Sequence, residues 1–198
     1  MNYPETISNL IDKLTRLPSV GPKTAERYAF YLLKQDQNSL EDLSSLIKNL
    51  KEKTISCQSC KAISEKTPCD ICSDKNRDTK TICLVENIQD LVSIESTKQY
   101  KGKYFVLGGL INTIEDIGPE KLEIKALIKK IEAEKIEELI LALNFTLEGE
   151  TTALYLKRIL KDKVKISRLA KGLPAGSDLE YADQLTLASA LKNRSVLS

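Results

Sequence analysis

Two C-x-x-C pairs near the middle of the chain limit its fold more than any other feature. The first pair is Cys57 and Cys60, and the second pair, eight residues further on, is Cys69 and Cys72. Four thiolates at this spacing can form two facing turns that hold one tetrahedral Zn²⁺. A closed site of four cysteines leaves no coordination position for a catalytic water. We therefore interpret the four cysteines as ligands of a structural zinc ion.

The segment between the two pairs cannot form a core of its own, because residues 61–68 are few and polar. Metal binding would therefore supply the local folding free energy. Two disulfides, or a redox C-x-x-C motif, are alternative explanations of the same cysteines. No secretory sequence supports the disulfides, and redox motifs rarely come doubled. We expect one structural zinc ion and a reducing, cytoplasmic environment.

Absences in the composition exclude several classes of function. The chain of 198 residues contains no histidine, which excludes Ser-His and Cys-His nucleophilic catalysis, histidine general bases and histidine-ligated zinc. We expect no membrane span, since no apolar run approaches the roughly 20 residues required, and we see no signal peptide. The net charge is only +2. Binding to nucleic acid would therefore depend on individually placed basic residues.

The first 56 residues are predicted to be helical. Apolar residues at helical spacing predict one helix over residues 7–17 and, after a turn rich in Pro and Gly, a second helix up to about residue 34. Ser39 and Asp42 fit a capping box that opens a third helix. Together these predictions describe a small helical region at the N-terminus.

The first two helices and their turn have the shape of a helix-hairpin-helix element. Lys23, Arg27 and Lys34 fall opposite the apolar stripe of the second helix, so they share an outward face. A helix N-terminus beside them can bind a phosphate without reading a base. An ordinary helical hairpin with solvated lysines explains the same pattern. The usual element has two hairpin glycines, and Ser19 occupies the first of those positions here.

Residues 81–198 alternate between strand and helix patterns. Near-continuous apolar strands are predicted at residues 81–86, 104–109, 138–143 and 164–167. Helices are predicted after a cap at Asn87, from Pro119 onward, and over residues 150–162 and 184–193. This alternation predicts a parallel sheet that is covered on both faces. Cys83 lies within the first strand, where we expect a small buried residue instead of a metal ligand. The predicted fold class is α/β.

Acidic residues follow two of these strands, at the edge of the sheet where ligands collect. Glu86 ends the first strand, and Glu148 and Glu150 follow the third. Such acids can bind Mg²⁺ for phosphoryl chemistry, or they can stabilise helix N-termini. Further on, residues 157–171 contain seven Lys and Arg residues against one Asp. This stretch is either a phosphate-facing strip or a solvated edge.

The order of these parts resembles the RecR family of bacterial recombination mediators over nearly the whole chain. The similarity is carried by the four cysteines, the hairpin at residues 17–27, and residues 85–86, 104–109, 117–120, 147–150 and 168–181. The resemblance implies four parts: a helix-hairpin-helix DNA-binding region (1–56), a four-cysteine zinc finger (57–80), a Toprim-type α/β domain (81–170) and a C-terminal assembly segment (171–198).

The resemblance also implies a non-enzymatic role in DNA repair and recombination. It implies binding to single- and double-stranded DNA without sequence preference, and cooperation with RecO and RecF to load RecA onto single-stranded DNA. It further implies homodimers and ring-like homotetramers that can encircle DNA. Lys23 and Arg27 match positions that are associated with DNA contact, and Glu148 and Glu150 lie where RecO is thought to dock.

The chain departs from the family pattern in several places. Phe105 stands where histidine is common, residues 112–113 where Ser-Pro is common, Phe145 where proline is common, and Lys171 where histidine is common. These differences leave the zinc ligands and the hairpin intact. The first three alter the Toprim loops.

Two other hypotheses remain beside the mediator. Catalytic Toprim enzymes pair the first-strand glutamate with an Asp-x-Asp motif, and this chain has Glu148-Gly149-Glu150 in that place. A Mg²⁺-dependent nuclease or primase-like enzyme would use Glu86 together with these two acids. The third hypothesis is a zinc-stapled interaction module without a role at DNA. The altered acidic motif favours the mediator.

Overall fold

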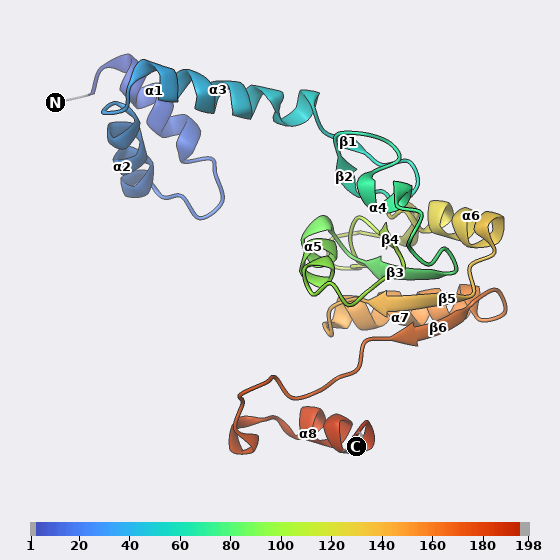
Figure 1. Ribbon diagram of the computed structural model, residues 1–198. Helices are drawn as coiled ribbons and strands as arrows, with labels where there is room; N and C mark the ends of the chain where they lie inside the picture. The colour runs from blue at the N-terminus through green and yellow to red at the C-terminus, as the bar shows by residue number, and fades with distance from the viewer. Residues whose placement is uncertain (1–2, 195–198) are drawn as a thin grey trace. The chain divides into compact units, whose positions relative to one another are not determined.

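The computed structural model describes residues 3–194, which fall into two compact units (Figure 1). The first unit ends at Thr54, and the second begins at Ile55. Within residues 3–194, no helix is both long enough and apolar enough to cross a membrane. The architecture is the α/β class with a helical N-terminal region that the sequence predicts.

The N-terminal unit consists of α1 (Glu5–Leu14), α2 (Pro22–Leu32) and α3 (Gln37–Glu52). Pro22 takes the first helical position of α2, where its fixed φ and missing N–H have no cost. The predicted cap of α3 is wrong by one turn. Asp36 is the N-cap, and its carboxylate accepts a hydrogen bond from the backbone N–H of Ser39 at 3.0 Å. Aspartate caps a helix as well as serine does, so α3 begins at the earlier of the two candidates.

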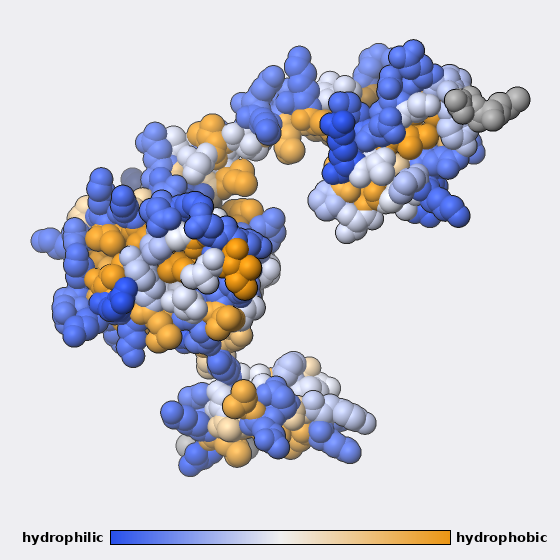
Figure 2. All heavy atoms as spheres, turned by 180° about the vertical axis from the view of Figure 1, so that it is seen from behind, coloured by the Kyte–Doolittle hydropathy of each residue, from blue (hydrophilic) through white to orange (hydrophobic). Residues whose placement is uncertain are grey.

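The three helices leave apolar surface uncovered in the N-terminal unit. Ala25 and Ala29 are its buried residues on α2, whereas Leu46, Ile47 and Leu50 of α3 are exposed. An apolar groove of about 420 Å³ runs between the helices. The space-filling view shows such hydrophobic patches among the hydrophilic side chains of the chain's surface (Figure 2).

The second unit is built on a parallel sheet in the order β4-β3-β5-β6. Its strands are β3 (Thr81–Val85), β4 (Lys103–Val106), β5 (Glu138–Ala142) and β6 (Lys165–Arg168). The connecting helices are α5 (Ile88–Ser96), α6 (Ile124–Glu134) and α7 (Leu147–Leu160). After the sheet come a short 3-10 turn η2 (Leu179–Tyr181) and α8 (Gln184–Lys192).

Alternating side chains divide the interior of this unit into two cores. Ile82 and Leu84 of β3 pack in one core with residues of α6 and α7. Cys83 and Val85 point to the opposite face and pack in the other core with Leu91 of α5. The predicted burial of Cys83 is confirmed, and burial raises the pKa of its thiol to about 12. Two covered faces explain why the strands are almost continuously apolar.

Local capping decides where several helices begin. Asn87 caps α5 as the sequence suggests, accepting a hydrogen bond from the N–H of Asp90 at 3.0 Å. Thr146 caps α7, which begins three residues earlier than predicted. The helix expected from Pro119 is instead a short 3-10 turn, η1 (Pro119–Lys121), followed by α6. Neither Glu86 nor Glu150 is an N-cap residue, but Glu150 lies in the first turn of α7, where a carboxylate stabilises the helix N-terminus.

Ser19 occupies a strained position in the hairpin of the N-terminal unit. Its φ is +63°, a left-handed conformation that costs an L-residue roughly 1–2 kcal/mol and costs glycine almost nothing. We expect Ser19→Gly to stabilise the N-terminal unit by up to about 1 kcal/mol, measured by hydrogen exchange or by thermal unfolding. Ser45→Gly, in the middle of α3, is the matched control and should destabilise the unit by roughly 0.5–1 kcal/mol. A destabilising effect of both changes would contradict the assignment.

Candidate metal centre and nucleic-acid interface

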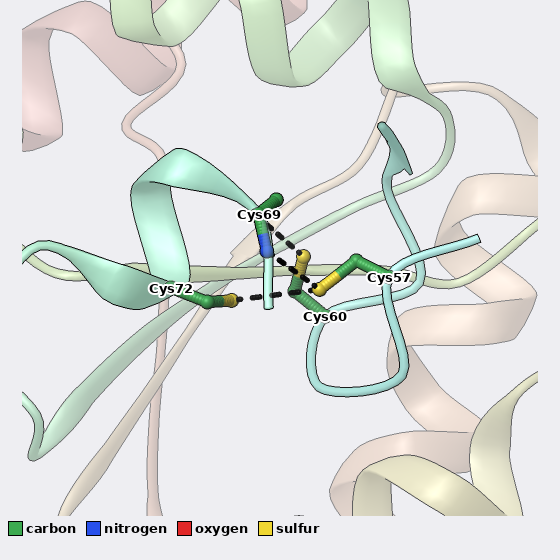
Figure 3. A group of neighbouring side chains, drawn as sticks. All are labelled: Cys57, Cys60, Cys69 and Cys72. Carbon is green, nitrogen blue, oxygen red and sulfur yellow. Dashed lines mark hydrogen bonds between the residues drawn. The ribbon is translucent and has the colours of Figure 1, made fainter. Parts of the chain in front are cut away.

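The four predicted zinc ligands come together in the structure. Cys57 follows the short strand β1 (Ile55–Ser56), which pairs with β2 (Ile63–Ser64), and Cys60 lies in the turn between these strands. Cys69 is the N-cap residue of α4 (Asp70–Ser73), and Cys72 lies within this helix. All four Sγ atoms lie within 4.8 Å of one another. Figure 3 shows the four side chains pointing toward one centre. We call this group the cysteine knuckle.

The sulfur positions fit a tetrahedral metal ion. At a Zn–S distance of about 2.3 Å, the corners of a regular tetrahedron lie about 3.8 Å apart. The Sγ atoms of Cys57 and Cys72 are 4.0 Å apart, and those of Cys60 and Cys69 are 3.6 Å apart. The backbone N–H of Cys69 also donates to Sγ of Cys57 at 3.4 Å, which favours a thiolate there. The donor set and its spacing thus fit a closed S4 metal site.

The cysteine knuckle is packed against the sheet instead of standing in a loop. Cys57, Cys60 and Cys69 are buried in the same core as Tyr104 and Val106 of β4. β4 is an edge strand. The carbonyl of Cys60 accepts a hydrogen bond from the N–H of Val106 at 2.8 Å. The knuckle therefore binds a backbone N–H of β4 that would be exposed if this edge of the sheet were uncovered.

Lys103 attaches the second half of the knuckle to the same strand. The residue is only 8% exposed, although it is a lysine in β4. Its Nζ donates to the carbonyls of Ile71, Cys72 and Asp74 at 2.9, 3.1 and 2.8 Å. These three bonds use all three protons of the ammonium group. The buried positive charge also lies beside a site that would carry excess negative charge with four thiolates and one divalent ion. Sequence reasoning missed Lys103.

The cluster predicts a clear difference between two cysteine substitutions. Cys72→Ser removes one of four ligands and should abolish tight metal binding, measured as metal per chain in purified protein. It should also increase hydrogen exchange at Val106, because the knuckle covers that amide. Cys83→Ala is the matched control, since Cys83 is buried in β3 outside the cluster. Equal metal content in both variants would refute the site.

The role of Lys103 can be tested separately from the ligands. Lys103→Met keeps most of the side-chain length but leaves three carbonyls without their donor. We expect it to lower the free energy of unfolding by about 1–3 kcal/mol and to speed metal release to a chelator. Lys101→Met, at an exposed position two residues earlier, is the control and should change neither quantity. Unchanged metal release in Lys103→Met would show that the lysine does not support the site.

The predicted DNA-contacting residues lie on one side of the hairpin. Lys23 and Arg27 are exposed, one turn apart on α2. No side chain among residues 3–194 caps the N-terminus of this helix, so the backbone N–H groups of Lys23 and Thr24 remain available to an anion. The nearby acid, Glu26, accepts a hydrogen bond from the hydroxyl of Tyr3. The arrangement can bind phosphates, but it offers no pattern of donors and acceptors for reading bases.

The acids at the carboxyl ends of the strands have different surroundings. Glu86 accepts a hydrogen bond from the side-chain amide of Asn144 at 3.2 Å. Glu150 forms ion pairs with Arg168 at 2.7 Å and with Lys171 at 3.2 Å. The hydrogen bond from Arg168 is the main reason that the pKa of Glu150 lies below its ordinary value. Glu148 is half-buried and forms no ion pair with any residue from 3 to 194. The three carboxylates therefore have different partners and are not equivalent to one another.

Two of the departures from the family pattern contact each other here. The ring of Phe145 lies 4.2 Å from the guanidinium carbon of Arg168 and 4.6 Å from Nζ of Lys171. Glu150 pairs with both of these cations. The four side chains form one cluster where the chain leaves β6, which we call the Phe145 cluster. The departure at Phe105 has a different explanation, because that ring is buried in the core of the sheet.

Much of the basic stretch at residues 157–171 takes part in ion pairs within the unit. Lys163 pairs with Glu132 at 2.6 Å, and Lys165 pairs with Glu138 at 3.2 Å. Together with the Phe145 cluster, these pairs engage four of the seven cations that the sequence places there. The structure thus favours a structural use of this stretch over a phosphate-facing strip.

Comparisons with known proteins agree with this division of the chain. Family models match residues 7–51 (RecR, helix-hairpin-helix), 80–170 (Toprim domain) and 172–195 (RecR, C-terminal). The chain is 48% identical over 195 residues to Recombination protein RecR of Moorella thermoacetica, covering 98% of each chain. It is 44% identical to that of Natranaerobius thermophilus, covering 99% of each, and 44% identical to that of Staphylococcus aureus strain JH9, covering 98% of each. The chain therefore belongs to the RecR family of non-catalytic recombination mediators.

Proposed function

We propose that this recombination mediator holds DNA through phosphate contacts from the hairpin of its N-terminal unit. The observation that carries the proposal is the exposure of Lys23 and Arg27 beside the uncapped N-terminus of α2. Lys23 lies in the first turn of α2 and Arg27 lies one turn further along the same face, and neither is held in an ion pair within residues 3–194. Phosphate contacts of this kind bind single- and double-stranded DNA without sequence preference.

The hairpin contacts can be tested by their salt dependence. Replacing Lys23 and Arg27 with glutamine should weaken binding to both DNA forms. It should also reduce the slope of log K against log salt by about 2 for each bound hairpin. The matched control replaces Lys48 and Lys51, two exposed cations of α3, with glutamine. The two double variants then have the same net charge. Equal affinities of the two double variants at low salt would contradict the proposal.

We propose that the ion of the cysteine knuckle is Zn²⁺, with Cys57, Cys60, Cys69 and Cys72 as its ligands. Tetrahedral sites with four thiolates bind zinc or iron, and the closed geometry suits a structural ion. When bound, the ion supplies folding free energy and no reaction step. Elemental analysis of protein purified without added metal distinguishes zinc from iron. Thiolate ligation also fits a reducing compartment, so we place the protein in the cytoplasm, and at the nucleoid when it is bound to DNA.

For the partners, we propose that the chain acts with RecO and RecF to load RecA onto single-stranded DNA. Glu148 and Glu150 are the proposed RecO-docking residues. Their surroundings indicate unequal roles, because only Glu148 is free of ion pairs within the described residues. Glu148 would then contact the partner directly, and Glu150 would mainly hold Arg168 and Lys171 in place.

The two glutamates should differ in their effects on stability and on RecO binding. Glu148→Gln should weaken capture of purified RecO and leave thermal unfolding unchanged. Glu150→Gln should also lower stability at neutral pH. Because the pKa of Glu150 is lowered in the folded state, its stabilisation is present above the ordinary pKa and is lost as pH falls through the lowered value. The stability difference between Glu150→Gln and the unaltered chain should therefore shrink in acid. A constant difference would contradict this account.

We further propose the division into four parts at residues 1–56, 57–80, 81–170 and 171–198, with the last part used for assembly. Leu179, Tyr181 and Leu185 in that part are exposed apolar residues, which suits contacts between copies. A homodimer or homotetramer could place several hairpins around one DNA molecule. Measurement of mass in solution, with and without DNA, tests this assembly, and a strict monomer would refute it.

A further inference from the structure

We propose that Tyr31 gives the hairpin a stacking surface for unpaired bases, so that the protein discriminates single-stranded DNA from duplex. This inference rests on the proposed function, because it requires the same face of α2 to meet DNA. It adds the class of substrate to that function. Lys23 and Arg27 would hold phosphates of either form, whereas Tyr31 would contact the flat face of a base, which only a single strand presents freely.

The three side chains form one stripe along α2. Lys23, Arg27 and Tyr31 follow each other at intervals of four residues. With 3.6 residues per turn they fall within an arc of about 80°, and their Cα atoms rise about 6 Å from one to the next. The buried residues Ala25 and Ala29 lie on the other side of the helix. The aromatic ring therefore extends the row of cations along the exposed face.

Tyr31 is exposed without the contacts that explain neighbouring aromatic residues. It is 63% exposed, and its hydroxyl makes no hydrogen bond within residues 3–194. Tyr3, by contrast, packs edge-on against Phe30 with 5.2 Å between ring centroids. Tyr28 has the guanidinium of Arg27 over its ring at 5.8 Å. A large uncovered ring at Tyr31 is available for a ligand with a π face.

The apolar groove of the N-terminal unit does not account for Tyr31. Leu32 and Leu33, the next two residues, both line that groove, but Tyr31 does not. The ring thus shares its surroundings with the cations and lies apart from the apolar surface that would suit a protein partner. Residues 22–34 contain three cations and one acid, and that acid, Glu26, already accepts a hydrogen bond from Tyr3. A positive face with an exposed ring fits single-stranded nucleic acid, which combines phosphates and accessible bases.

The experiment compares fluorescence anisotropy of labelled oligothymidylate and of a blunt duplex of equal length. Tyr31→Leu keeps apolar area but removes the ring. It should weaken binding of the single strand at least about five-fold and leave duplex binding unchanged, since stacking acts on each contacted base. Tyr31→Phe should keep single-strand affinity. Leu33→Ala, which removes exposed apolar surface about 160° from Tyr31 around the axis of the same helix, is the matched control and should bind both forms normally.

Tyr31→Trp supplies a direct readout, because the sequence contains no other tryptophan. Its fluorescence should be quenched by oligothymidylate and not by the duplex. The stacking proposal would be overturned if Tyr31→Leu lost equal affinity for both DNA forms or lost affinity for neither. A change in the mass of the variant protein in solution would also overturn it. The variant in which glutamine replaces Lys23 and Arg27 distinguishes failure of the stacking proposal from failure of the proposed hairpin function. If that variant loses affinity for both DNA forms while Tyr31→Leu binds both normally, only the stacking proposal fails. If the glutamine variant binds normally, the hairpin function itself fails.

Discussion

The packing of the cysteine knuckle on β4 covers one edge of the sheet on which the second unit is built. β4 has a neighbour on one side only, and an uncovered edge of this kind invites pairing with other chains. The carbonyl of Cys60 pairs with Val106, and Lys103 binds the carbonyls around Cys72. A metal ion that fixes the knuckle would therefore also complete one edge of the sheet. On the proposed metal binding, the loss of the ion would also expose this edge of the sheet.

Sequence patterns predicted the features that depend on short-range spacing. The two C-x-x-C pairs, the apolar strands and the cap at Asn87 follow from residues that lie close together in the chain, and the structure contains all of them. The start of α3 was misplaced because Asp36 and Ser39 are both good caps, and local pattern alone does not rank them. Strand ends were shifted by one to three residues, most at the end of β4, which the sequence predicts at residue 109 and which lies at Val106.

The placement of the knuckle on the sheet could not be predicted, because it depends on contacts between distant segments. Lys103 contacts residues about 30 positions earlier in the chain. In sequence it looks like an ordinary surface lysine. The one available signal was its position at the start of the apolar run of β4, where a charged side chain on a doubly covered sheet needs partners. The Phe145 cluster was hidden for the same reason, although two of its members stood out as departures from the family pattern.

The distribution of charge explains how a protein with so little net charge can act on DNA. Many basic residues of the second unit are neutralised by nearby acids, as Lys163, Lys165 and Arg168 show. A single hairpin then offers few free cations, and few phosphate contacts give weak binding that salt readily disrupts. On the proposed function, repeated hairpins in an assembled ring would raise affinity through effective concentration, without any stronger single contact. Weak individual contacts would also let such a ring move along DNA.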